Sequence, residues 1–188
     1  MIMEAAIKVI AKNGFHGAQI SKVAKEAGVA EGTIYLYFKN KEDILISIFT
    51  QKMDQFVKQV EEEVNKKQSV KEKLYTVVNM HFNQFMHNHY LAIVTQLELR
   101  QSNYELRMKI NQNILKPHID VIDRIIEEGV EEGVIKPHIN IRLMRQMIFG
   151  TLDDIVTNWV MNDQKYDLVA QTDEVYEILT DGLYVQSS

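Results

Sequence analysis

The chain has 188 residues and a formal net charge of −5, and it contains no cysteine. The lack of cysteine excludes disulfide bonds and thiol catalysis, and no apolar run approaches the roughly 20 residues that a membrane span requires. Only two prolines and eight glycines interrupt the chain, which leaves room for long helices. We therefore expect a cytoplasmic globular protein.

The charge is unevenly distributed along the sequence. Residues 1–49 hold six lysines and five acidic residues, a net charge of +1, whereas the remainder holds 15 basic and 21 acidic residues, a net charge of −6. Charged partners respond to the local distribution rather than to the total. The acidity therefore belongs to the second part of the chain, and the first part is weakly basic.

Apolar residues recur at intervals of three and four through most of the chain, and no segment alternates as a strand would. The sequence predicts an all-α fold of about nine helices, organised as an N-terminal domain of residues 1–45 and a second domain of residues 46–188. Pro117 lies inside one helical pattern, so we expect a kink or a break there. The expected helices cover residues 2–13, 20–27, the segment after Gly28, 41–64, 70–87, 90–100, 104 to about 128, 140–162, and 166 or 167 to 185.

The stretch from Ile20 to Glu42 has the pattern of two short helices joined by a tight turn. Gly28 stands where such a turn requires a positive φ, which glycine adopts without steric cost. Ala24 and Ala27 are small enough to let the second helix cross closely. The expected apolar face consists of Val23, Val29, Ile34 and Phe38. The side chains then left facing outward are Thr33, Tyr35, Leu36 and Tyr37.

The order of residues in this stretch resembles the DNA-binding segment of the tetracycline-repressor (TetR) family. In that family a Val/Ile-Ala pair is followed by Ala-Gly-Val, a Leu/Ile-Tyr pair, an aromatic pair and a Lys-Glu/Asp doublet. An isolated helix-turn-helix pattern is weak, whereas this longer composite is specific. The matching residues are Val23-Ala24, Ala27-Gly28-Val29, Gly32-Thr33-Ile34-Tyr35, Tyr37-Phe38 and Lys41-Glu42.

The resemblance implies that the N-terminal domain binds a palindromic double-stranded DNA operator, with the second helix of the motif in the major groove. Tyr35, Tyr37 and Lys41 are the implied phosphate contacts, and simple packing is the alternative for the two tyrosines. No arginine precedes Arg100, so lysine, hydroxyl and methyl contacts and the shape of the DNA are expected to dominate. The candidates for contacts to base edges are Ser21, Lys22, Glu31, Gly32, Thr33 and Leu36.

The second domain combines an apolar core with a group of polar residues after Leu99. Arg100 and Arg107 follow a run of aliphatic residues that begins at Leu91. An apolar channel with cationic and amide groups at its mouth suits a ligand with a long tail and an anionic head. Most of the apolar residues belong to the core in any case. The candidate ligand-binding residues are Phe85, Met86, Ile93, Gln96, Leu97, Arg100, Arg107 and Phe149.

Several segments resemble one group within the family, the acyl-CoA-responsive regulators of fatty-acid degradation in Bacillus-type bacteria. The resemblance implies a repressor that leaves its operator when long-chain acyl-CoA binds, with no other cofactor. The CoA phosphates need cationic partners. Arg100 and Arg107 are the first candidates, although an ion pair with a nearby carboxylate is an equal alternative for Arg107. The further candidates are Lys109, Lys116 and Arg145. The resembling segments are residues 44–47, 91–107, 145–151 and 159–169.

The helix expected over residues 140–162 has too many apolar residues for a single stripe. A helix that is apolar on more than one face is buried on more than one side. Together with the helix expected to close the chain, it is therefore predicted to form a homodimer through a four-helix bundle, as in the family. Its apolar residues are Leu143, Met147, Phe149, Leu152, Ile155, Val156, Trp159 and Val160.

Two other interpretations remain open. A metal enzyme would use His81, His87 and His89, but His87 and His89 point to opposite sides of a helix and no carboxylate at helical spacing completes a zinc site. No phosphate-binding loop or nucleophile motif occurs either, so we expect neither catalysis nor a metal. The second interpretation keeps the family but makes the effector a cationic drug. That ligand would use aromatic faces and buried carboxylates, for which Glu98, Asp153, Asp154 and Trp159 are the candidates.

Overall fold

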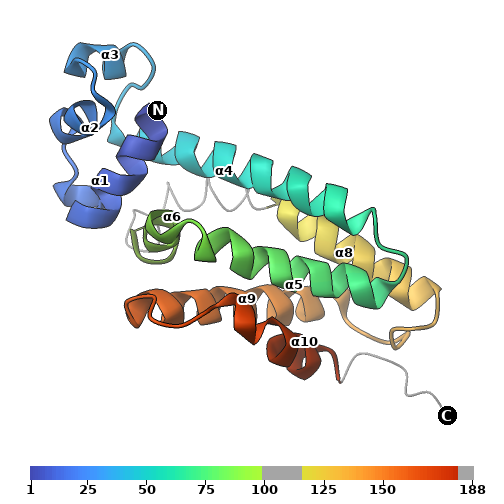
Figure 1. Ribbon diagram of the computed structural model, residues 1–188. Coiled ribbons are helices and arrows are strands. Elements are labelled where there is room, and N and C mark those ends of the chain that lie inside the picture. Colours follow the sequence, from blue (N-terminus) through green and yellow to red (C-terminus); the bar gives the residue numbers. More distant parts are fainter. Residues whose placement is uncertain (99–115, 182–188) are drawn as a thin grey trace. The chain divides into compact units, whose positions relative to one another are not determined.

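The structure is a computed structural model that describes residues 1–98 and 116–181 (Figure 1). Within these residues it contains nine α-helices, one π-helix and one 3-10 helix, and no β-strand. The all-α prediction is therefore confirmed. The α-helices are α1 (Ile2–Gly17), α2 (Ile20–Ala27), α3 (Glu31–Tyr35), α4 (Lys41–Val64), α5 (Val70–Met86), α6 (His89–Ile93), α8 (Lys116–Glu131), α9 (Ile141–Met161) and α10 (Thr172–Thr180). The π-helix η1 covers Val94–Glu98, and the 3-10 helix η2 covers Val169–Gln171.

The helices form two compact units that are interleaved along the chain. The first unit contains Met1–Asp54 and the described residues of 88–115, and the second contains Gln55–His87 and the described residues of 116–188. Helix α4 belongs to both units, because the boundary after Asp54 falls inside it.

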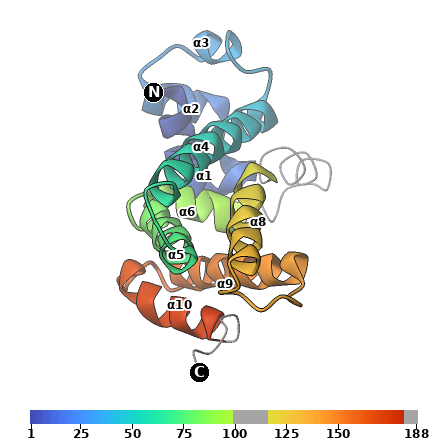
Figure 2. The ribbon, with the colours of Figure 1, turned by 90° about the vertical axis from the view of Figure 1, so that its right-hand side faces the viewer.

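The first unit is built on α1, which contacts α2, α6 and η1, while α3 packs on α2 (Figures 1 and 2). The backbone of α1 leaves helical geometry at Gly14 (φ 70°, ψ 158°), where the sequence predicted the helix to end, and a further turn then extends to Gly17. This kink turns Phe15 into the core, where only 5% of it is exposed. The core also contains Ile10, Ile34, Ile44, Leu45 and Ile48.

The turn between α2 and α3 has the predicted geometry. Gly28 adopts the left-handed conformation (φ 68°, ψ 30°) and ends α2. Val23 and Ile34 are buried, and Val29 and Phe38 are partly buried against the same core. The predicted apolar face is therefore confirmed, and it fixes which side of α3 remains in solvent.

The start of α4 is fixed by a pair of side-chain caps. The Asn40 Oδ1 accepts a hydrogen bond from the Asp43 backbone N–H at 2.8 Å, and the Asp43 Oδ2 accepts one from the Lys39 backbone N–H at 3.0 Å. Such caps satisfy N–H groups that have no partner within the helix. They hold Lys41 as the first residue of α4.

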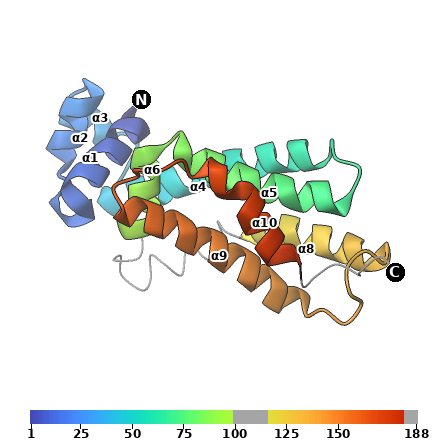
Figure 3. The same ribbon diagram turned by 60° about the horizontal axis from the view of Figure 1, so that its bottom comes forward.

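In the second unit, α5 contacts α8, α9 and α10 (Figures 2 and 3). A capping box between Ser69 and Glu72 begins α5. Helix α8 runs through Gly129, where the sequence predicted its end, and stops at Glu131. A Cβ at Gly129 would lie 2.5 Å from the Ile135 Cδ1, so this glycine serves close packing and not termination.

Two expected helices differ from the structure. Residues 90–98, expected as part of one α-helix, form α6 followed by the π-helix η1. The last helix begins at Thr172 and not at 166 or 167. The Trp159 indole N–H donates to the Tyr166 carbonyl at 2.8 Å, and the Asp167 Oδ1 accepts from the Val169 backbone N–H at 2.9 Å. These bonds hold a turn where the periodicity predicted a helix.

The expected helix from 104 to about 128 lies partly outside the described residues. Its described part begins at Lys116, and the predicted kink or break at Pro117 stays a prediction because the preceding residues lie outside the described part. No helix in residues 1–98 or 116–181 is long and apolar enough to cross a lipid bilayer.

Candidate functional site

The end of α3 and the residues directly after it present three large side chains to solvent. Tyr35 is 54% exposed, Leu36 80% and Tyr37 69%. Single exposed apolar side chains are common, but several that adjoin one another indicate an interaction site. Packing, the alternative considered for the two tyrosines, is therefore wrong, and their hydroxyl groups are free to meet a partner.

Lys41 joins this surface to the core of the first unit. Its ammonium group donates to the His16 carbonyl at 3.2 Å and lies 4.6 Å from the centre of the Phe15 ring. Both contacts are to neutral groups, so they orient the ammonium without neutralising its charge. Lys41 thus offers a positioned cation at the N-terminus of α4.

The other predicted DNA contacts lie on α2 and α3 of the same unit. Ser21, Lys22, Glu31 and Gly32 are exposed, and Thr33 is half-buried. Lys22 donates to the Asn13 Oδ1 at 2.8 Å and to the Gly17 carbonyl at 3.5 Å. At Gly32 a Cβ would meet no atom within 4 Å, so this glycine is not required by packing within the chain.

A long-range hydrogen bond that the sequence did not predict fastens η1 to α1. The Glu98 Oε2 accepts from the Phe15 backbone N–H at 2.6 Å. Glu98 was a candidate for a cationic ligand, but this carboxylate already serves the backbone at the kink of α1. Three predicted effector residues lie beside it in chain order: Gln96 is buried, and Ile93 and Leu97 are half-buried.

In the second unit, His81 is at the centre of a cluster of aromatic rings. Its ring centre lies 5.3 Å from that of Phe85 and 6.2 Å from that of Phe149, both edge to face. Phe56 and Phe82 complete the cluster. Burial lowers the pKa of His81 to about 4, because an apolar environment disfavours the charged imidazolium. The structure thus brings together Phe85 and Phe149, which lie 64 positions apart in the sequence.

Sequence reasoning missed the central place of His81, although a signal was present. The residue follows Val77 by four positions and precedes Phe85 by four, so it lies on the apolar face of α5. Met86, the remaining predicted effector residue of this unit, is half-buried.

The predicted cationic contacts are not all placed. Arg100, Arg107 and Lys109 lie outside the described residues. Arg145 forms an ion pair with Asp123, and both side chains are about four-fifths buried. This carboxylate compensates the charge of Arg145, which makes it a weaker candidate for a phosphate contact than a lysine or arginine in solvent.

Among the described residues, no group of three or more His, Asp or Glu side chains could hold a metal ion. His87 and His89, two of the histidines considered as ligands, are exposed and lie on either side of the break between α5 and α6.

Helix α9 has two apolar faces, as predicted, but they differ in environment. One face, with Leu152, Val156 and Trp159, is fully buried within the second unit. The other exposes Leu143 (54%), Met147 (55%) and Met161 (69%). Gly150, which lies between Met147 and Met161 in the sequence, is also exposed, and a Cβ there would meet no atom within 4 Å. Figure 3 shows the course of α9. This exposed face is suited to a second helix.

Family models match both parts of the chain. The model for bacterial regulatory proteins of the tetR family matches residues 2–48, and the model for the C-terminal region of YsiA-like proteins matches residues 49–182. The chain therefore belongs to the TetR family of bacterial regulatory proteins. Members of this family are DNA-binding transcriptional regulators, which confirms the prediction of a regulator rather than an enzyme.

The chain is also similar to characterised members of the family. It is 58% identical over 183 residues to the fatty acid metabolism regulator protein of Bacillus subtilis, covering 97% of this chain and 94% of that protein. The crystal structure of the transcriptional regulator FadR from Bacillus subtilis in complex with stearoyl-CoA matches with a TM-score of 0.93 at 58% identity, covering 97% of this chain and 98% of that one. The fatty acid degradation regulator FadR from Bacillus halodurans matches with a TM-score of 0.93 at 55% identity, covering 97% of each chain.

Proposed function

We propose that this chain is a transcriptional repressor of fatty-acid degradation genes that leaves its operator when long-chain acyl-CoA binds. The observation that carries the proposal is the 58% identity, over 97% of the chain, to a regulator whose structure holds stearoyl-CoA. At such similarity over nearly the whole chain, the ligand class is the natural inference for this protein as well.

In this proposal residues 1–45 are the DNA-binding domain. Tyr35, Tyr37 and Lys41 hold phosphates, while Ser21, Lys22, Glu31, Gly32, Thr33 and Leu36 face the base edges. A single DNA-binding domain of this size contacts too short a stretch of DNA for useful specificity, so two copies of the chain read the two halves of a palindrome. The exposed apolar face of α9, together with α10, forms the homodimer contact.

Residues 46–188 form the effector-binding and dimerisation domain. An acyl chain gains about 0.8 kcal/mol for each buried methylene, so a long chain supplies most of the affinity. The proposed contacts of the acyl chain are Phe85, Met86, Ile93, Gln96, Leu97 and Phe149. Arg100 and Arg107 are the proposed partners of the CoA phosphates. Acyl-CoA is the effector, and no other cofactor is involved.

Release requires that acyl-CoA bind the DNA-free state more tightly than the DNA-bound state, because a ligand shifts an equilibrium only by its differential affinity. Helix α4 begins at the phosphate anchor Lys41 and continues into the second unit. It is therefore the continuous element through which the effector state can reach the DNA contact. Such a regulator acts in the bacterial cytoplasm, where both DNA and acyl-CoA occur.

The test begins with selection of an operator from random duplex DNA by the purified protein. Long-chain acyl-CoA is then titrated into the protein–operator complex while fluorescence anisotropy of the DNA is followed. Release by acyl-CoA, but not by free CoA or by a cationic lipophile, is the expected result. Release by the cationic lipophile alone would show that the effector is a cationic compound, as in the drug-sensing members of the family, and not acyl-CoA.

A further inference from the structure

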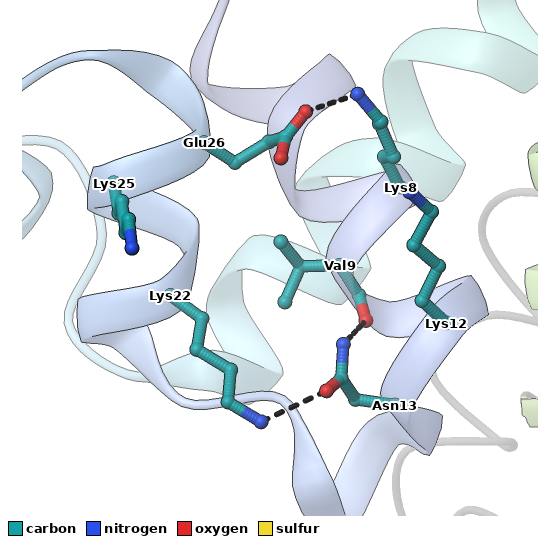
Figure 4. Close-up of a pocket in the computed structure, with 7 residues that line it drawn as sticks. All are labelled: Lys8, Val9, Lys12, Asn13, Lys22, Lys25 and Glu26. Carbon is teal, nitrogen blue, oxygen red and sulfur yellow. Dashed lines mark hydrogen bonds and ion pairs between the residues drawn. The ribbon is translucent and has the colours of Figure 1, made fainter.

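The first unit has a pocket between α1 and α2 that carries most of its positive charge. It has a volume of about 390 Å³ and is called the lysine pocket below. Four lysines and one glutamate line it, a net formal charge of +3 (Figure 4). The lining residues are Lys8, Val9, Lys12, Asn13, Lys22, Lys25 and Glu26.

The net charge of the lysine pocket, +3, is larger than that of residues 1–49 as a whole. Residues 1–49 carry a net charge of only +1, so residues 1–49 outside the lysine pocket carry −2. Those other charged residues are Lys39 and Lys41 against Glu4, Glu31, Glu42 and Asp43. The net positive charge of residues 1–49 is therefore concentrated in the lysine pocket.

Most of the positive charge in the pocket remains uncompensated. Lys8 pairs with Glu26 (dashed in Figure 4), which is the pocket's single carboxylate. Lys22 donates to neutral oxygens of Asn13 and Gly17, and the Lys12 ammonium lies 5.7 Å from the centre of the Tyr90 ring. Within the described part of the chain, Lys25 has no ion-pair partner and is exposed.

We propose that the lysine pocket binds a backbone phosphate of the DNA that flanks the bases read by α3, and so adds one charge contact per protomer to the proposed operator complex. The pocket includes Lys22, which faces the DNA in the proposed function, so the two surfaces are continuous. Neutralising a phosphate releases counterions, and this contributes affinity without sequence preference. This inference rests on the proposed function, since it requires an operator complex.

The test uses the double variant Lys12→Gln with Lys25→Gln, which spares the Lys8–Glu26 pair and Lys22. The matched control is Lys58→Gln with Lys71→Gln, two exposed lysines of α4 and α5 whose removal changes the net charge equally. Operator affinity is measured between 50 and 300 mM salt on a duplex with 10 extra base pairs on each side and on one cut to the operator alone. Melting temperatures of both variants verify that folding is retained.

On the long duplex, the pocket variant should bind about tenfold more weakly than the control near 0.1 M salt, and its log–log salt slope should be smaller by about 1 per protomer. On the short duplex the two variants should agree. Equal affinities and slopes of the two variants on the long duplex would overturn the proposal. Failure of the wild-type protein to bind any operator would instead contradict the proposed function.

Discussion

The Glu98 carboxylate accepts a hydrogen bond from the backbone N–H of Phe15 at 2.6 Å, although the two residues lie 83 positions apart. The Phe15 ring in turn lies beneath the ammonium group of Lys41, at 4.6 Å. Glu98 ends the π-helix that carries the proposed effector contacts Gln96 and Leu97. Within the first unit, these contacts connect the segment expected to respond to acyl-CoA with the proposed phosphate anchor.

A Glu98→Gln variant tests this connection. The amide keeps the shape of the side chain but lacks the charge that strengthens the bond to the Phe15 N–H. We expect the variant to bind the operator less than threefold more weakly than the wild type does in the absence of acyl-CoA. The ratio of its operator Kd with acyl-CoA to that without should be about tenfold smaller than the wild-type ratio, which corresponds to about 1.4 kcal/mol of coupling. Anisotropy titrations with and without saturating acyl-CoA give both quantities. Glu62→Gln, at an exposed position of α4, is the control, and equal ratios for the two variants would exclude a role for Glu98.

The proposed phosphate clamp predicts a loss of operator affinity when the tyrosine hydroxyls are removed. Tyr35→Phe with Tyr37→Phe deletes two exposed hydroxyl groups, each worth about 1 kcal/mol if it donates to a phosphate, without disturbing the core. Binding should weaken more than tenfold at constant melting temperature, with the salt slope unchanged because no charge is lost. Lys41→Ala should instead lower the slope by about 1 per protomer. The control is Tyr90→Phe, at another exposed tyrosine of the first unit, and it should bind the operator as the wild type does. If the Tyr35→Phe, Tyr37→Phe double variant binds as tightly as this control, the phosphate clamp is refuted.

Local chemistry explains which features could be predicted from the sequence. Gly28 and the apolar spacing of Val23 and Ile34 determine the helix-turn-helix, and the Asn140 cap begins α9 where its periodicity starts. The π-helix after α6 and the late start of α10 could not be predicted. Glu98 at the end of the π-helix bonds to Phe15, which lies 83 positions away, and the turn before η2 is held by a bond from the Trp159 indole to the Tyr166 carbonyl that apolar periodicity does not reveal.

The two candidate sites also differ in how far the sequence alone could predict them. The DNA-facing residues form one short stretch with a specific pattern, so sequence alone could nominate them. The proposed effector residues come from separate helices, so their spacing in the sequence does not show which of them line one site. His81 illustrates this, because its place on an apolar helix face was visible but its four aromatic neighbours, from α4, α5 and α9, were not.

Substitution by alanine should have different effects on stability and on operator affinity at Gly28 and at Gly32. Gly28→Ala forces an alanine into the left-handed region, which costs about 1–2 kcal/mol, so urea unfolding should show reduced stability. At Gly32 a Cβ meets no atom of the chain, so Gly32→Ala should leave stability unchanged or slightly raised. If the backbone of Gly32 approaches the major groove, that variant should nevertheless lose at least tenfold in operator affinity. Unchanged affinity for Gly32→Ala would remove this residue from the proposed interface.

The exposed face of α9 predicts the oligomeric state. Burial of Leu143 and Met147 against a partner stabilises a dimer by about 1.5–3 kcal/mol for each side chain. Leu143→Glu with Met147→Glu should therefore convert a micromolar dimer to monomer in sedimentation velocity, and operator binding should weaken with it. The control Gln51→Glu with Gln59→Glu adds the same charge at exposed positions of α4. A dimer that persists in the first variant would place the interface elsewhere.

His81 makes the stability of the second unit depend on pH. Burial lowers its pKa from 6.5 to about 4, so between these values the unfolded chain binds a proton that the folded chain does not. The free energy of unfolding should therefore fall as the pH is lowered from about 6.5 to about 4. At about 1.4 kcal/mol per pKa unit, the loss from this residue is about 3 kcal/mol.

His81→Phe isolates that contribution, because it replaces the imidazole by a ring of similar shape that does not titrate. Urea unfolding at pH 7, 6 and 5, at one protein concentration, should show a difference between variant and wild type that grows in favour of the variant as the pH falls. His138→Gln removes an exposed histidine and should follow the wild type. A difference between His81→Phe and wild type that is independent of pH would show that His81 is not held neutral by its aromatic surroundings.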